Sequence, residues 1–394
     1  MRLQEIFWGD RVLWVLMILL AFFSFLPVYS ASTNLSYVVG VGSPVGYLMK
    51  HFVIVMFGFS ITYLIHRIPY TYFKGVAIIA FPIIVFLLLY TALQGTTIDG
   101  ANASRWIKIP FIGVSFQTST LAFVHLLVYV AFYLQKHEHS QVSFQSSFLA
   151  LWMPVLLIVF LILPANFSTA AMLFLMVLML TFVGGYPIRY LIYIFGLGAA
   201  GLTFFVLVAL AFPEAMPNRV DTWRSRIENF SAQDNGAENY QIELSKTAIA
   251  TGGLFGKGAG KSVMKNFLPQ SSSDFIYAII VEEYGILGGI ALIGLYLMVL
   301  FRILVNAHKT EELFGKLLIV GMGVPIVFQA FINMGVALQV LPVTGQTLPL
   351  VSSGGTSVWM TCLAFGILLS VTARKEQKSD AMPKNPIIEF SETL

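Results

Sequence analysis

The chain has 394 residues, of which 57% are hydrophobic and only 11% are charged, against roughly 25% charged residues in an ordinary soluble domain. This composition excludes a soluble globule. The formal net charge of +4 is spread over many segments and forms no basic patch interleaved with aromatic residues, so nucleic acid is not an expected partner.

Ten apolar segments are expected to cross a membrane, which predicts an all-α, polytopic integral membrane protein. Each is about 20 residues long, the length that spans ~30 Å of hydrocarbon. They cover residues 12–30, 47–66, 74–94, 116–135, 147–163, 168–184, 189–211, 275–302, 314–338 and 355–373. No cleavage site follows the first segment, so we expect it to be a retained helix and not a signal peptide. A single cysteine, Cys362, excludes an intramolecular disulfide.

Lysine and arginine residues predict the orientation, because short cytoplasmic loops are enriched in both. They gather at the two termini and in every second loop, which places both termini in the cytoplasm. One large extracytoplasmic loop, about 212–273, separates helices seven and eight, and its aromatic residues favour order over disorder. We expect a membrane domain over 1–378 and a disordered cytoplasmic tail over 379–394.

Asp274 lies where this long loop meets the eighth helix, after three serines. Aspartate and serine both cap helix N-termini, so one interpretation is that Asp274 caps this helix. The other is that a carboxylate at the outer membrane surface serves as a general base. The two roles are compatible, because a helix N-terminus favours the ionised carboxylate.

Glu282 and Glu283 follow roughly 12 Å deeper at the helical rise. Acids inside a transmembrane segment are functional hypotheses by default. We expect them to brace the bundle, with proton transfer as the alternative, and to pair with buried groups such as Arg105, Lys108 or Asn333.

The glycine-rich run TGGLFGKGAGKS, 251–262, fails the phosphate-loop pattern because Phe255 stands where its first glycine is required. Lys257, Lys261 and Lys265 nevertheless predict a flexible cationic strip suited to a diphosphate or to anionic headgroups. The alternative is a solvated loop without a ligand.

The segment 341–357 concentrates proline, glycine, serine and threonine between the last two helices. Irregular backbone at membrane depth is tolerated where it is buried in protein or lines a cavity. We therefore expect this segment to wall a pocket, with a plain surface connector as the alternative.

Taken together, these motifs make the chain resemble the SEDS family (shape, elongation, division and sporulation). The resemblance spans nearly the whole chain and is carried by RWI at 105–107, YQ at 240–241, the glycine run, SDFIYAIIVEEYG from Ser273, INMGV at 332–336, LPVTGQTLPL from Leu341, and SGGTS. The form LPVTGQTLPL is closer to the FtsW branch than to the RodA branch.

The resemblance implies a peptidoglycan glycosyltransferase that polymerises lipid II at the outer face of the bacterial cytoplasmic membrane during cell division, at the septum. It carries the family's essential acid to Asp274. It also implies a divalent metal, Mg or Mn, a class B penicillin-binding protein as partner, and other division proteins. The candidate substrate-binding residues are Arg105, Lys257, Lys265, Gln241 and Ser352.

Five positions depart from the family's pattern, two of which, Gln270 and Ser273, lie beside Asp274 and replace an acid and a threonine. Thr120 and Asn166 stand where the family has acids, and Phe123 stands where it has a lysine. An ion pair through the fourth helix is therefore not transferred to this chain, whereas Asp274 is retained.

The expected chemistry follows from the substrate. Asp274 would take the proton of an attacking sugar hydroxyl, a role typically worth about 10² to 10⁴ in rate, and direct displacement would invert the anomeric configuration. Two other functions are open: a lipid II flippase, which needs ionisable groups through the bilayer, and a noncatalytic division scaffold, which does not need Asp274.

Overall fold

All ten predicted apolar helices are found in the structure, a computed structural model that describes residues 8–37, 43–94, 97–98, 101–102, 106–108, 115–139, 143–211, 237–268 and 271–381. Within these residues, eight helices are long and apolar enough to span a membrane, and two shorter apolar helices complete the ten. The first seven spans are α1 (Arg11–Tyr37), α2 (Pro44–Ile65), α3 (Phe73–Gln94), α4 (Thr118–Lys136), the continuous run of α5 (Phe144–Ser147), η3 (Phe148–Trp152) and α6 (Met153–Ile162), then α7 (Phe167–Val183) and α8 (Ile188–Ala211). The last three are α11 (Ile276–Lys309), α12 (Leu313–Ala337) and α13 (Gly355–Ala381).

Local sequence signals set several helix starts. The Ser43 hydroxyl caps α2 by accepting from Gly46 N, and Pro44 occupies the first helical position, where its missing N–H is not needed. The Asn166 side chain caps α7 by accepting from Thr169 N at 3.2 Å. Each cap satisfies one of the free amides of a first helical turn.

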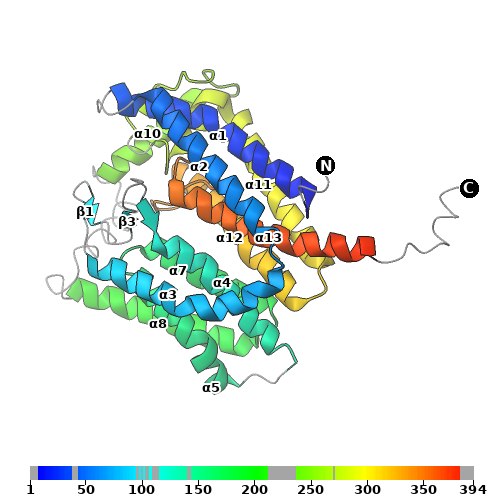
Figure 1. Cartoon of the computed structure of the whole chain (residues 1–394). Helices are drawn as coiled ribbons and strands as arrows, with labels where there is room; N and C mark the ends of the chain where they lie inside the picture. Colours follow the sequence, from blue (N-terminus) through cyan, green and yellow to red (C-terminus); the bar gives the residue numbers. More distant parts are fainter. Residues whose placement is uncertain are drawn as a thin grey trace, which may run out of the picture.

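The centre of the bundle is formed by α4, α12 and α13, the most deeply buried spans. α13 packs on both α2 and α12, and α4 contacts α3, α7, α12 and α13. In Figure 1 the start of α1 and the end of α13 lie at one end of the bundle, and α10 and the short strands lie at the other. We call this second end the outer end, after the predicted orientation.

The outer end carries the short elements. They are the antiparallel pairs β1 (Thr97–Ile98) with β2 (Ala101–Asn102) and β3 (Trp106–Lys108) with β4 (Ser115–Gln117), the helix α10 (Ala237–Gly252) and the single turn η5 (Met264–Asn266), with η2 (Tyr70–Tyr72) at the opposite end. The expected order of the long loop is thus confirmed over 237–268, while 212–236 lie outside the described residues. The helix α13 continues through Ala381, the third residue of the predicted tail 379–394, and residues 382–394 lie outside the described part of the chain.

Asp10 joins three helices at the inner end of the bundle, the end opposite the outer end. Its Oδ1 accepts from Leu13 N at 3.0 Å and so caps α1, its Oδ2 is paired with Arg302 and accepts from Asn306 Nδ2 at 2.7 Å, and its own N–H donates to Thr372 Oγ1. Burial alone would raise the pKa of Asp10, but the hydrogen bonds from Arg302, Asn306 and Leu13 hold that pKa below its ordinary value. One carboxylate therefore ties α1, α11 and α13 together.

We expect Asp10→Ala to lower the free energy of unfolding by about 2 to 4 kcal/mol, from a lost cap and lost charged hydrogen bonds. A carboxylate with a depressed pKa stabilises the fold above its unfolded pKa of about 3.9, and this stabilisation is lost as pH falls through the folded value. The gap between the thermal midpoints of wild type and variant in detergent should thus be constant between about pH 5 and 8, and shrink below about pH 4. Glu311→Ala, at an exposed acid on the same side, should leave the midpoint unchanged; an equal drop there would contradict the assignment.

Candidate functional site

Asp274 lies in a tight turn, 271–275, that leads into α11 at the outer end. The structure places Phe275 at the N-cap of α11, and the Phe275 side chain makes no capping hydrogen bond. Asp274 therefore lies one residue before the N-cap position that the sequence had suggested for it. Asp274 itself is half-buried, which leaves its carboxylate within reach of a ligand.

The segment between α12 and α13 holds this turn from one side. Ser352 Oγ donates to Ser273 O at 2.6 Å and accepts from Leu348 N at 2.8 Å, and Ser353 N donates to Ser272 O at 2.9 Å. Ser352 is buried. The structure thus places Ser352 as a fixed brace behind the Asp274 turn.

Asn333, on α12, ties the same two pieces of chain together. Its Nδ2 donates to Asp274 O and to Gln346 O, both at 2.7 Å. Gly345 has φ +66°, and a Cβ added there would lie 3.6 Å from Asp274 Oδ2. The Asp274 carboxylate therefore faces the bend at Gly345, a residue that sequence reasoning did not single out although its TGQT setting is typical of a turn.

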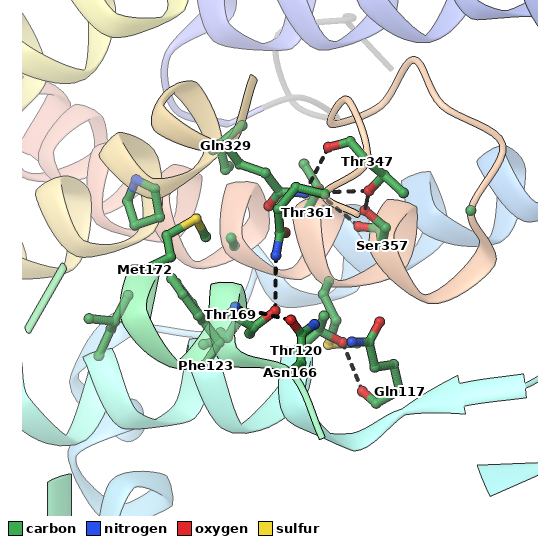
Figure 2. Close-up of a pocket in the computed structure, with 18 of the residues that line it drawn as sticks. Gln117, Thr120, Phe123, Asn166, Thr169, Met172, Gln329, Thr347, Ser357 and Thr361 are labelled. Carbon is green, nitrogen blue, oxygen red and sulfur yellow. Dashed lines mark hydrogen bonds between the residues drawn. The ribbon is translucent and has the colours of Figure 1, made fainter. Parts of the chain in front are cut away.

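A cavity of about 130 Å³ opens beside this bend and runs into the bundle. It is walled by α4, α7, α12, α13 and the 341–354 segment, and its lining includes Gln117, Thr120, Phe123, Asn166, Thr169, Met172, Gln329, Gly345, Gln346, Thr347, Ser357 and Thr361. Figure 2 shows polar side chains converging from these elements, with Thr347 Oγ1 and Ser357 Oγ 2.6 Å apart. The expectation that 341–357 walls a pocket is confirmed.

All of the side chains that line this cavity within the described residues are uncharged. Three of the departures from the family pattern, Thr120, Phe123 and Asn166, line it. Asn166 is occupied as the cap of α7, and Gln346 Nε2 donates to Thr169 Oγ1 at 3.0 Å in the same turn. Uncharged groups joined by hydrogen bonds therefore form the part of the cavity wall where the family pattern has charged residues.

We expect Thr120→Glu to lower the free energy of unfolding by about 2 to 4 kcal/mol, because the new carboxylate in this cavity would lack a cationic partner. The double variant Thr120→Glu/Phe123→Lys places a cation three residues away on the same helix and should recover part of the loss. Thermal unfolding of both variants in detergent measures this. Equal losses in the single and double variants would show that burial, and not charge pairing, sets the effect.

Glu282 and Glu283 are buried in α11. Of the expected partners, Asn333 donates instead to Asp274 O and Gln346 O, while Arg105 and the side chain of Lys108 lie outside the described part of the structure. Glu282 Oε1 lies 2.6 Å from Lys257 Nζ and accepts from Val263 N at 3.0 Å, and Oε2 accepts from the hydroxyl of Ser262. Glu283 Oε1 accepts from Ser262 N and from the Ser30 hydroxyl of α1. The partners come from the glycine-rich loop because that loop packs beside the helix. This arrangement agrees with the bracing role.

The cationic strip is folded against the bundle, where Lys257 and Lys265 make defined contacts. Lys265 is buried, and its Nζ donates to Ser30 Oγ at 3.1 Å and to Gly260 O at 2.8 Å, while Lys257 is half-exposed beside Glu282. Lys261 is exposed, and Gln241 is half-buried near the start of α10. The described contacts of Lys257 are thus with Thr251 and Glu282, and those of the Lys265 ammonium with Ser30 and Gly260, while Arg105 lies outside the described residues.

A resident metal cage is not formed by the described residues, in which no three His, Cys, Asp or Glu side chains gather. Asp274 is the carboxylate that faces Gly345, one of the residues lining the cavity. Mg²⁺ commonly takes one or two carboxylates together with substrate phosphates, so the donor set suits an ion that arrives with a diphosphate and not a permanent site.

A bundle of ten apolar helices with a braced carboxylate and a neutral cavity at its outer end defines the class: a polytopic membrane protein with a polar site at one membrane surface. The family model of FtsW, RodA and SpoVE, described as "Cell cycle protein", matches residues 10–377. The chain belongs to this family.

Similar proteins include a probable peptidoglycan glycosyltransferase FtsW of Saccharophagus degradans, 35% identical over 301 residues and covering 73% of each chain. Another, of Coxiella burnetii, is 31% identical over 346 residues, 85% of this chain and 88% of its own. A solved structure described as "Structural coordination of polymerization and crosslinking by a peptidoglycan synthase complex" matches with a TM-score of 0.72 and 26% identity over 93% of this chain and 98% of its own. Thermus thermophilus RodA matches with a TM-score of 0.65 and 26% identity, over 93% and 97%.

Proposed function

We propose that this chain is a peptidoglycan glycosyltransferase that polymerises lipid II, with Asp274 as its general base. The observation that carries the assignment is the Asp274 turn at the outer end: Ser352 and Asn333 brace its backbone, and its half-exposed carboxylate faces Gly345, a residue that lines the cavity. The relatives named above are themselves described as peptidoglycan glycosyltransferases.

The proposed reaction is a single displacement in which one bond to the anomeric carbon forms and another breaks. The acceptor sugar hydroxyl attacks the anomeric carbon of the donor, and a new carbon–oxygen bond forms. The bond between that carbon and the diphosphate oxygen breaks, and its electron pair leaves with undecaprenyl diphosphate. The proton of the hydroxyl passes to an Asp274 carboxylate oxygen. Displacement in one step inverts the donor, from an α to a β linkage.

Charge on the leaving diphosphate requires a cation nearby. Lys257 and Lys265 are engaged by Glu282 and Ser30, so we assign this role to Arg105. A divalent ion, Mg or Mn, would neutralise the diphosphate when bound, and Asp274 could contribute one carboxylate oxygen to it beside the substrate phosphates.

The same proposal includes a location and a partner. We infer that the chain lies in the bacterial cytoplasmic membrane, with both termini in the cytoplasm, at the division septum, together with a class B penicillin-binding protein and other division proteins. The solved complex that it resembles joins polymerization and crosslinking, and α1 begins and α13 ends at the same end of the bundle (Figure 1).

The flippase alternative needs ionisable groups along a path through the bilayer. The cavity lining is uncharged within the described residues, and Glu282 and Glu283 are closed off by the glycine-rich loop. Both observations favour the enzyme over the transporter.

The test is to incubate purified chain, with and without the penicillin-binding partner and with Mg or Mn, with labelled lipid II. Glycan strands should form and be visible by gel. Movement of lipid II between leaflets of a vesicle without any polymer, under conditions in which the partner is bound, would overturn the enzyme assignment in favour of the flippase. Binding of the partner with neither polymer nor movement would favour the scaffold.

A further inference from the structure

The glycine-rich loop, residues 252–265, lies beside a break in α11. Gly285 has φ +71° and ψ −176° inside this helix, so the helical bonds from Ile286 N to Glu282 O and from Leu287 N to Glu283 O are not made. At about 1.5 Å per residue from Ile276, the break is roughly 14 Å inside the helix. Unpaired backbone groups at that depth would be strongly unfavourable.

The loop satisfies all four of the freed groups. Ile286 N donates to Gly253 O at 2.9 Å and Leu287 N to Leu254 O at 3.3 Å. In return, the amides of residues 257 and 258 donate to Glu282 O and Glu283 O, each at 2.9 Å. The loop thus replaces the missing part of the helical ladder.

This exchange requires glycine on both sides. A Cβ at Gly252 would lie 2.2 Å from Val281 O, one at Gly256 would lie 2.2 Å from Glu283 O, and one at Gly285 would lie 2.2 Å from Leu254 O. These contacts are with backbone atoms, which cannot move aside as a flexible side chain can. The spacing of glycines that suggested a phosphate loop is explained by this backbone packing.

The side chains of Glu282 and Glu283 hold the same loop. Glu282 is bonded to Lys257, Ser262 and the amides of residues 263 and 264, and Glu283 to Ser262 N. We call this whole arrangement, the loop with residues 282–287 of α11, the clasp.

The clasp fixes the inner end of a short helical segment whose outer end is the Asp274 turn. Residues 276–284 run from that turn to the break, and α10 packs along α11. The turn is braced on its other side by Ser352 and Asn333. Because this helical segment is held at both ends, its position in the bundle is fixed. Asp274, which directly precedes the segment, is positioned with it.

We propose that Glu282, Lys257 and Gly285 are positioning residues that set the place of the Asp274 carboxylate through this clasp; the inference rests on the proposed function. A displacement of about 1 Å at a reacting group can lower a rate about 100-fold. Gly285→Ala and Glu282→Gln should therefore lower kcat for glycan synthesis by about 100-fold while KM for lipid II stays within about two-fold.

The first test compares Gly285→Ala with Gly294→Ala, a glycine of the same helix whose added Cβ meets no atom within 4 Å. Gly294→Ala should keep wild-type kcat. Thermal midpoint and partner binding are measured for every variant. Wild-type kcat in both glycine variants would overturn the inference.

The second test separates positioning from general loss of structure. If the clasp acts through Asp274, adding Gly285→Ala to Asp274→Asn should lower kcat little further, because the place of a carboxylate that is no longer present cannot matter. Losses that multiply would show that the clasp acts elsewhere and would overturn the inference. Should Asp274→Asn alone retain wild-type activity, it is the proposed function that fails, so the two failures are distinguishable.

The third test asks whether removing the unpaired charge rescues activity. Glu282→Gln leaves Lys257 without its carboxylate partner at a partly buried site. The double variant Glu282→Gln/Lys257→Gln also removes that ammonium. Its kcat should be at least ten-fold higher than that of Glu282→Gln alone, because the two amides can hydrogen-bond to each other and still hold the loop. No recovery in the double variant would contradict the role of this pair.

Discussion

Asp274→Asn is expected to lower the rate of glycan synthesis from lipid II by about 10² to 10⁴, because an amide cannot accept the proton of the attacking hydroxyl. The backbone contacts of the turn, from Asn333 and Ser352, do not involve the carboxylate. The variant should therefore keep the thermal midpoint of the wild type and its binding to the penicillin-binding partner. The measurement is polymerisation of labelled lipid II with partner, with Mn or Mg present.

Asp274→Glu is the matched variant for this prediction. It keeps a carboxylate but moves it by about one methylene toward Gly345, where space is limited. It should retain more activity than the asparagine variant and less than wild type. Equal product from wild type and Asp274→Asn would remove Asp274 from the chemistry and return it to a structural role.

Asn333→Leu should have a large effect on both stability and rate. The substitution leaves Asp274 O and Gln346 O without their donor, and each buried carbonyl left unpaired costs about 1 to 3 kcal/mol. The free energy of unfolding should fall by about 2 to 5 kcal/mol, and kcat by about ten-fold or more. Thermal unfolding and lipid II polymerisation measure the two effects.

Phe328→Leu serves as the control on the same helix, since Phe328 is exposed on α12. It should change neither quantity. If Asn333→Leu kept wild-type stability, the two carbonyl bonds would not hold the turn, and the account of how Asp274 is fixed would be wrong.

The ten helices could be predicted from the sequence because hydrocarbon thickness sets the length of an apolar run. The predicted 314–338 and 355–373, for example, correspond to α12 and to the first part of α13. The wall of the cavity at 341–357 was also predictable, since its prolines and glycines cannot continue a helix.

The partners of Glu282 and Glu283 could not be predicted in the same way. Apolar periodicity shows that a helix is buried but not which distant polar group meets it, and Ser30 gives no signal inside the apolar run of α1. The break at Gly285 was equally hidden, because glycine is common in transmembrane helices. The N-cap of α11 was misassigned because four successive residues, 271–274, all had the chemistry of a cap.

The clasp also bears on how the protein enters the membrane during synthesis. On its own, α11 carries two carboxylates in its outer half, and each central acid opposes insertion by about 2.5 to 3.5 kcal/mol. Lys257, Ser262 and Lys265 precede α11 in the chain, so they have left the ribosome before Glu282 and Glu283 do. The groups that neutralise the acids are thus already made when the helix inserts, and the order of residues along the chain supplies the order of assembly.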